Sequence, residues 1–139
     1  MGKILITLLV LLPFGIKAQG VFGADHKSVR DTMTKYGFVF EKTDKRPDGT
    51  VYDDFSYANG GADGREDAVC YFNKQGICYQ YRRILPIATL IENLEHLNKN
   101  YTKVDDVSWV NKKNTVKVYI SINDILYYIS YISMEISDE

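Results

Sequence analysis

The sequence predicts an α+β protein whose helices pack on one face of an antiparallel sheet. Two segments carry apolar residues at helical spacing, and the segments between them alternate apolar and polar residues. Turns rich in Gly, Asn and Asp join the alternating segments. The predicted order is one helix, four strands, a second helix and three strands, with both helices on the same face. The opposite face of such a sheet can remain in water.

The amino terminus has the pattern of a secretory signal peptide. Lys3 gives a positive start, residues 4–12 are apolar apart from one Thr, and Pro13 and Gly15 break the run before Ala18. The run is too short to span a bilayer.

We therefore expect residues 1–18 to be a signal peptide, with cleavage after Ala18 or after Gly20. Residues 19–139 then form a single α+β domain that is secreted or periplasmic, with no stable membrane span. The chain has no Cys near the cleavage site, so a lipid anchor on that residue is not available.

The first helix is expected over residues 25–36. Asp25 can cap it, Val29 and Met33 lie one turn apart, and Gly37 suits the left-handed residue that ends a helix.

Four strands follow, by alternation and turn chemistry. Residues 38–43 and 51–58 are strands separated by the turn 45–50, and residues 59–67 are an acidic, Gly-rich loop. Residues 68–85 form a hairpin.

The register of that hairpin decides the state of the two cysteines. With Gly76 as a bulge residue, Phe72 faces Cys78, and Cys70 lies on the same face, diagonal to Cys78. That separation is long for a disulfide. In a two-residue-loop register the cysteines lie on opposite faces and cannot bond. A disulfide and two buried thiols both remain compatible with the sequence.

Pro86 can open the second helix, because a missing N–H costs nothing at the first position. Its expected apolar stripe is Ile87, Leu90, Ile91, Leu94 and Leu97, and its expected polar side is Glu92, Glu95, His96 and Lys99. Residues 101–110 are expected to be one strand with an irregularity at Asp105 and Asp106, followed by a turn at 111–114.

The carboxy-terminal stretch 116–133 alternates so regularly that its two faces are well specified. With Asn123 and Asp124 as a two-residue turn, the expected cross-strand pairs on the core face are Ile122–Ile125, Ile120–Tyr127, Val118–Ile129 and Val116–Tyr131. The wetter face carries Lys117, Tyr119, Ser121, Leu126, Tyr128 and Ser130.

Charge and motifs argue against several functions. The net charge of −1, near −3 without Lys3 and Lys17, gives no steering toward nucleic acid. His26 and His96 are expected at the surface, and no phosphate-binding loop or activated Cys is visible. We expect no cofactor and no metal site.

The leading hypothesis is a non-enzymatic domain that binds an unknown protein or peptide on an exposed sheet face. Tyr is enriched over other aromatics and is common at interfaces, so the candidate binding residues are Tyr119, Leu126 and Tyr128. The alternative is a small metal-dependent hydrolase that uses the acidic segment 53–67, although its spacing does not match a calcium loop.

The stretch "GVFGADHKSVRDTMTKYGF" resembles the glycine, short helix, glycine opening of small exported domains of the beta-lactamase-inhibitor-protein-like and SmpA/OmlA type. The later stretches "YFNKQGICYQY", "LIENLEHLNKNY" and "VSWV" resemble uncharacterised small exported proteins with the same layered architecture. The resemblance implies an α+β domain that binds other proteins in or beyond the periplasm. The chain lacks the lipid-anchor Cys of the outer-membrane members, and no binding residues are carried over.

Overall fold

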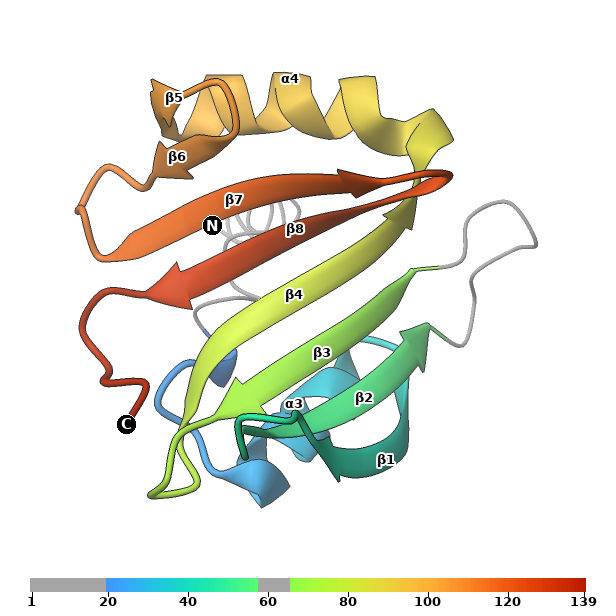
Figure 1. The fold of residues 1–139 in the computed structure, drawn as a ribbon, viewed down its shortest axis with the longest axis vertical. Coiled ribbons are helices and arrows are strands. Elements are labelled where there is room, and N and C mark those ends of the chain that lie inside the picture. The colour runs from blue at the N-terminus through green and yellow to red at the C-terminus, as the bar shows by residue number, and fades with distance from the viewer. Residues whose placement is uncertain (1–19, 58–65) are drawn as a thin grey trace, which may run out of the picture.

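The computed structural model describes residues 20–57 and 66–139. Within these residues two helices pack against one antiparallel sheet of eight strands in the order β1-β2-β3-β4-β8-β7-β6-β5 (Figure 1). The elements are α3 (His26–Lys35), β1 (Phe38–Lys45), β2 (Val51–Tyr57), β3 (Asp67–Phe72), β4 (Cys78–Pro86), the 3₁₀ turn η1 (Ile87–Thr89), α4 (Leu90–Asn100), β5 (Thr102–Asp105), β6 (Ser108–Val110), β7 (Val116–Asn123) and β8 (Leu126–Ser133). The α+β class and the antiparallel sheet are confirmed, and the predicted signal peptide lies outside the described residues.

The helix α3 begins and ends as its sequence predicts. The Asp25 side chain accepts a hydrogen bond from the Ser28 backbone N–H at 2.9 Å, which satisfies one of the free donors of the first turn. Gly37 follows the helix with a φ of +91°, a conformation that costs Gly little. Val29 and Met33 are fully buried beneath the sheet.

The hairpin of β3 and β4 has the bulged register. The Asn73 N–H donates to the Ile77 carbonyl, Phe72 pairs with Cys78, and Gly76 has a φ of +76°. Cys70 and Cys78 therefore share the core face and are both buried as free thiols.

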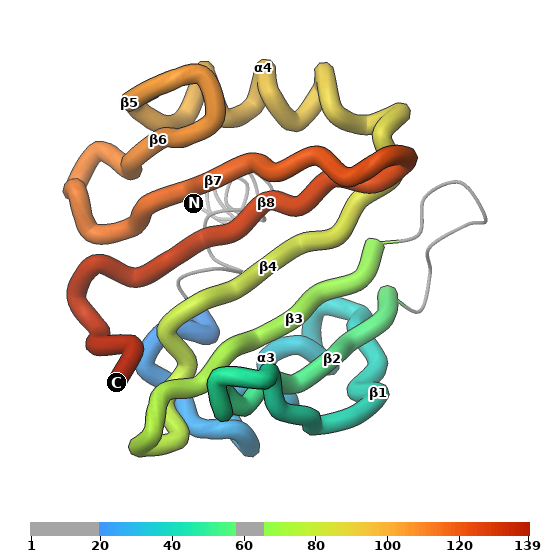
Figure 2. Tube along the Cα trace, in the orientation of Figure 1, coloured from blue at the N-terminus to red at the C-terminus, as the bar shows by residue number. Residues whose placement is uncertain are grey.

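The predicted helix-β4-helix-β3 order is wrong in its second half. Residues 101–110 form two strands, β5 and β6, because Asp105 accepts a hydrogen bond from the Val107 N–H and closes a turn there. Each half of the chain is thus one helix followed by a four-stranded meander, and β4 and β8 join the halves at the middle of the sheet (Figure 2).

The second helix also differs from the prediction. Pro86 ends β4 and precedes η1, so α4 starts only at Leu90. Ile87 and Ile91, expected in the apolar stripe, are 39% and 72% exposed, because the 3₁₀ turn rotates this end away from the core. Leu97 is the fully buried anchor of α4.

The β7–β8 hairpin keeps its predicted faces but not its predicted turn. Asp124 and Ile125 form the turn, so Ile120 pairs with Ile129 and Ile122 with Tyr127. This register is shifted by two residues from the predicted one, which preserves the two faces. Ile122 and Ile125 lie at the tip and are 59% and 74% exposed, so their assignment to the core was wrong.

Both helices cover the same face of the sheet. One core cluster joins Val29 and Met33 of α3 and Leu97 of α4 to the inward residues of the sheet. Trp109 donates from Nε1 to Asn98 Oδ1 at 3.0 Å and ties α4 to β6. In Figure 1 the strands of the first half pass in front of α3, so the viewer looks onto the other face.

Candidate functional site

The face of the sheet opposite the helices, called here the outer face, carries three rows of side chains defined by the strand register. From β2 onward the rows are Asp54–Val69–Arg82–Ser130–Tyr119–Ser108, Tyr52–Tyr71–Gln80–Ile132–Lys117–Val110 and Ser56–Asp67–Ile84–Tyr128–Ser121. Tyrosines therefore gather over β2, β3, β7 and β8, around the arginine of β4.

Arg82 lies at the centre of the outer face. Its Nε donates to Ser130 Oγ at 3.0 Å, which ties the side chain to β8. Its guanidinium carbon is 5.3 Å from the ring centroid of Tyr71 and 5.6 Å from that of Tyr128. Such cation–π contacts leave the remaining N–H groups of the guanidinium for another acceptor.

A second arginine approaches the same ring from the β1–β2 turn. The guanidinium carbon of Arg46 is 5.2 Å from the centroid of Tyr71. Burial raises the pKa of Tyr71 while Arg82 and Arg46 oppose the rise, which places both positive charges close to this phenol. We call Arg46, Tyr71, Arg82 and Tyr128 the arginine–tyrosine patch.

A small apolar cluster supports the patch from below and beside it. Val69, Tyr71 and Tyr79 are buried on the outer face, with Tyr52, Ile84 and Ile136 packed against them. Tyr52 and Tyr71 are in tilted ring contact at 5.9 Å. The aromatic rings beneath the two guanidinium groups are thus held by their neighbours before any partner arrives.

Acidic side chains on the outer face lie toward β1. Asp54 and Asp67 stand on β2 and β3, and Lys42 and Asp44 form an ion pair at 3.5 Å on β1. Burial raises the pKa of Asp54, and Asp67 and Asp44 add to the rise by repulsion. Among the described residues, no carboxylate forms an ion pair with Arg46 or Arg82.

The structure brings together the three residues singled out from the sequence. Tyr119 and Tyr128 are half-buried diagonal neighbours on the outer face, and Leu126 is 37% exposed two residues before Tyr128. Lys117 lies over the Tyr119 ring at 4.8 Å. Sequence reasoning did not single out Arg82, because only the β4–β8 pairing places it beside Tyr128. Tyr71 of β3 joins the site because Arg82 also contacts its ring.

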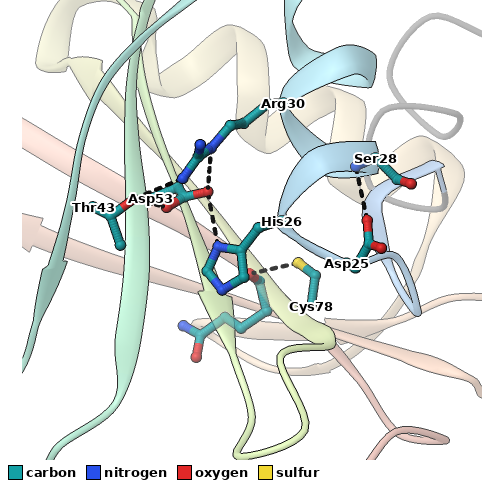
Figure 3. Close-up of polar contacts among 8 residues, drawn as sticks. Asp25, His26, Ser28, Arg30, Thr43, Asp53 and Cys78 are labelled. Atoms are coloured by element: carbon teal, nitrogen blue, oxygen red, sulfur yellow. Dashed lines mark hydrogen bonds and ion pairs between the residues drawn. The ribbon is translucent and has the colours of Figure 1, made fainter.

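The inner face holds a separate polar cluster around Asp53 (Figure 3). The fully buried Asp53 carboxylate accepts from Thr43 Oγ1 at 2.6 Å, and its Oδ2 lies 3.2 Å from His26 Nδ1 and 3.3 Å from Arg30 Nε. The His26 ring stacks on Phe72 at 3.6 Å.

The expectation that His26 is simply a surface residue is therefore incomplete. Only about a third of its side chain, 32%, is exposed, and α3 is joined through it to β2. The alternation of Val51, Asp53 and Phe55 is the sequence signal that places this carboxylate on the inner face.

The described members of the acidic segment proposed for a hydrolase do not all lie together. Asp53 and Asp54 point to opposite faces, and Glu66 accepts from Arg83 Nε at 2.5 Å. Asp67 shares the outer face with Asp54, and positions 59 and 63 lie outside the described residues. Across residues 20–57 and 66–139, no group of three or more His, Cys, Asp or Glu side chains is placed to bind a metal ion.

The other buried charge, Arg83, lies on β4 with its side chain on the face opposite to that of Arg82, as the alternation predicts. Burial disfavours its charge, but Tyr131 and Glu66 outweigh that effect and raise the pKa of Arg83. Burial lowers the pKa of the nearby His96, and Arg83 lowers it further. The ion pair between Arg83 and Glu66 therefore has a structural role in the region beneath α4.

Comparison of the chain with protein-family models, with curated proteins and with solved structures gives no significant match. The resemblance to beta-lactamase-inhibitor-protein-like and SmpA/OmlA-type domains therefore stays a prediction. In the part of the chain that is described, no helix has the length and apolar character needed to cross a membrane.

Proposed function

We propose that this chain is an exported, non-enzymatic domain that binds a protein or peptide on the outer face of its sheet. The observation that carries the proposal is the arginine–tyrosine patch. Arg46 and Arg82 lie over Tyr71 on the face that the helices leave uncovered, and neither forms an ion pair with a described carboxylate.

Two physical arguments support a macromolecular partner. Tyr and Arg are enriched among the residues that dominate binding energy at protein interfaces, since both combine a large apolar body with directional hydrogen bonds. Pre-packed rings also lose little conformational freedom on binding, which lowers the cost of association. The signal-peptide pattern of residues 1–18 supports export.

The test compares capture of a partner by the unmodified chain and by variants of the outer face. Tyr119→Ala and Tyr128→Ala should weaken capture from an envelope fraction at least tenfold, while their unfolding free energies fall by less than about 1.5 kcal/mol because both rings are half-buried. Ile91→Ala, which removes an exposed apolar side chain from α4, is the matched control and should capture normally.

Two results contradict the proposal. One is capture that is equally strong with all three variants. The other is a loss of stability of about 3–5 kcal/mol in the tyrosine variants, typical of a fully buried aromatic ring, because the rings would then belong to the core.

A further inference from the structure

If the outer face is the binding site proposed above, its charges indicate which chemical class of partner it binds. The patch presents two guanidinium groups on one phenol ring, at 5.2 Å and 5.3 Å from its centroid. Neither guanidinium has a carboxylate at ion-pairing distance among the described residues, so both retain N–H donors and positive charge for an acceptor on the partner. Within the described residues the ion-pairing carboxylates serve other cations, namely His26, Arg30, Lys42, Arg83 and Lys103.

The geometry of Arg82 also selects the kind of anion. Its Nε donates to Ser130, and its guanidinium lies near the rings of Tyr71 and Tyr128, so the terminal N–H groups remain as donors for another acceptor. A planar carboxylate accepts two parallel N–H bonds from such a group. The flanking rings of Tyr128 and Tyr119 provide an apolar surface for the rest of the side chain that carries it.

Charges around the patch favour a polypeptide over a nucleic acid. Asp54, Asp67 and Asp44 stand on the same face toward β1, and they would repel a continuous phosphate backbone that crossed the sheet. A peptide can place its carboxylate at β4 and a neutral or basic residue near β1. The net charge of −1 likewise gives no general attraction for polyanions.

We infer that the outer face binds an acidic polypeptide segment, with an Asp or Glu carboxylate of the partner bound by the guanidinium groups of Arg82 and Arg46 and an adjacent apolar side chain against Tyr128.

The experiment selects peptides from a random phage-displayed library on the purified chain and measures the affinity of synthetic copies by fluorescence anisotropy. Peptides whose binding requires Tyr128 should be enriched in Asp and Glu. Arg82→Gln and Arg46→Gln should each weaken them about tenfold, and replacing the acidic residues of the peptide by Asn or Gln should weaken them similarly. Lys99→Gln, an exposed charge on α4, is the matched control and should change little.

The outcomes separate this inference from the proposed function. Peptides that depend on Tyr128 but show no acidic enrichment, or that ignore Arg82→Gln and Arg46→Gln, overturn the acidic partner and leave the outer face as a binding site. A selection that yields no Tyr128-dependent peptide overturns both. An oligothymidylate that binds more tightly than the peptides, with the same dependence on Arg82, overturns the acidic polypeptide in favour of nucleic acid. Because Arg46 is exposed and lies outside the strands, its variant keeps the test valid if Arg82→Gln unfolds the sheet.

Discussion

Replacing Asp53 by Asn tests whether the buried carboxylate, and not merely its shape, holds α3 against the sheet. The substitution preserves the volume of the side chain and the oxygen that accepts from Thr43. It replaces Oδ2 by an NH₂ group that faces the donors of Arg30 and His26. The imidazole can adapt by exchanging its ring proton, whereas the guanidinium cannot accept a hydrogen bond.

The size of the expected stability loss depends on how deeply Asp53, His26 and Arg30 are buried. Asp53 is 0% exposed, while the side chains of His26 and Arg30 are 32% and 40% exposed, so water can partly replace what they lose. Breaking a fully buried ion pair costs about 3–5 kcal/mol, and charge-assisted hydrogen bonds contribute about 1.5–3 kcal/mol each. With the exposed partners discounted, we expect Asp53→Asn to lower the free energy of unfolding by about 2–3 kcal/mol.

Urea unfolding followed by circular dichroism measures this loss, and Asp54→Asn is the matched control. Asp54 is the next residue on the same strand, but it lies on the outer face, where burial and then the neighbouring acids raise its pKa. Its neutralisation should change stability by less than about 0.5 kcal/mol, as surface substitutions do. If Asp53→Asn costs no more than Asp54→Asn, the cluster around Asp53 does not stabilise the fold as argued.

Three further outcomes can be measured with the same purified chain. Burial and then the neighbouring Cys78 raise the pKa of Cys70, so a thiol reagent should label both cysteines only after unfolding in urea; unreactive sulfurs in urea would instead reveal a disulfide. Burial lowers the pKa of His96, so the unfolded chain binds that proton more tightly, and stability should fall as pH drops below about 6.5. A slope that persists unchanged in His96→Gln would refute this assignment. The buried hydroxyl of Tyr81 has no hydrogen-bond partner among the described residues, whereas that of Tyr131 bonds to an arginine, so Tyr81→Phe should be nearly neutral and Tyr131→Phe should cost about 1–2 kcal/mol in urea unfolding. The reverse order would contradict this reasoning.

Local chemistry made the first half of the fold predictable from the sequence. The Asp25 cap and the Gly37 stop are properties of neighbouring residues. For β3 and β4 the sequence left a Gly76 bulge and a two-residue loop as alternatives, and the structure has the bulge. Alternation likewise placed Ile129 inside and Tyr128 outside.

The errors arose where tertiary contacts outweigh local preference. A shift of two residues leaves both faces of the β7–β8 hairpin unchanged, so alternation cannot locate its turn. The turn residue Ile125 accepts a hydrogen bond from the Ile87 N–H at 3.0 Å, a contact between segments that are distant in the sequence. The site was predictable only in part for the same reason, since Tyr119 and Tyr128 share one hairpin but Arg82 meets Tyr128 only through the pairing of β4 with β8.

Because β4 pairs with β8, the sheet of each half of the chain is completed only by the other half. Within the described strands the β4–β8 pairing is the one pairing between strands that are not consecutive, and it joins Pro86 to Leu126 across about forty residues. Every other strand finds its neighbour through a short loop, so the entropy of closing this long loop is the largest single obstacle on the folding route. A chain interrupted after α4 would leave the β8-facing side of β4 unpaired, with the N–H and C=O groups of that side available to the same strand of another molecule. Domain swapping and aggregation through β4 are thus the failures to which this architecture is most exposed.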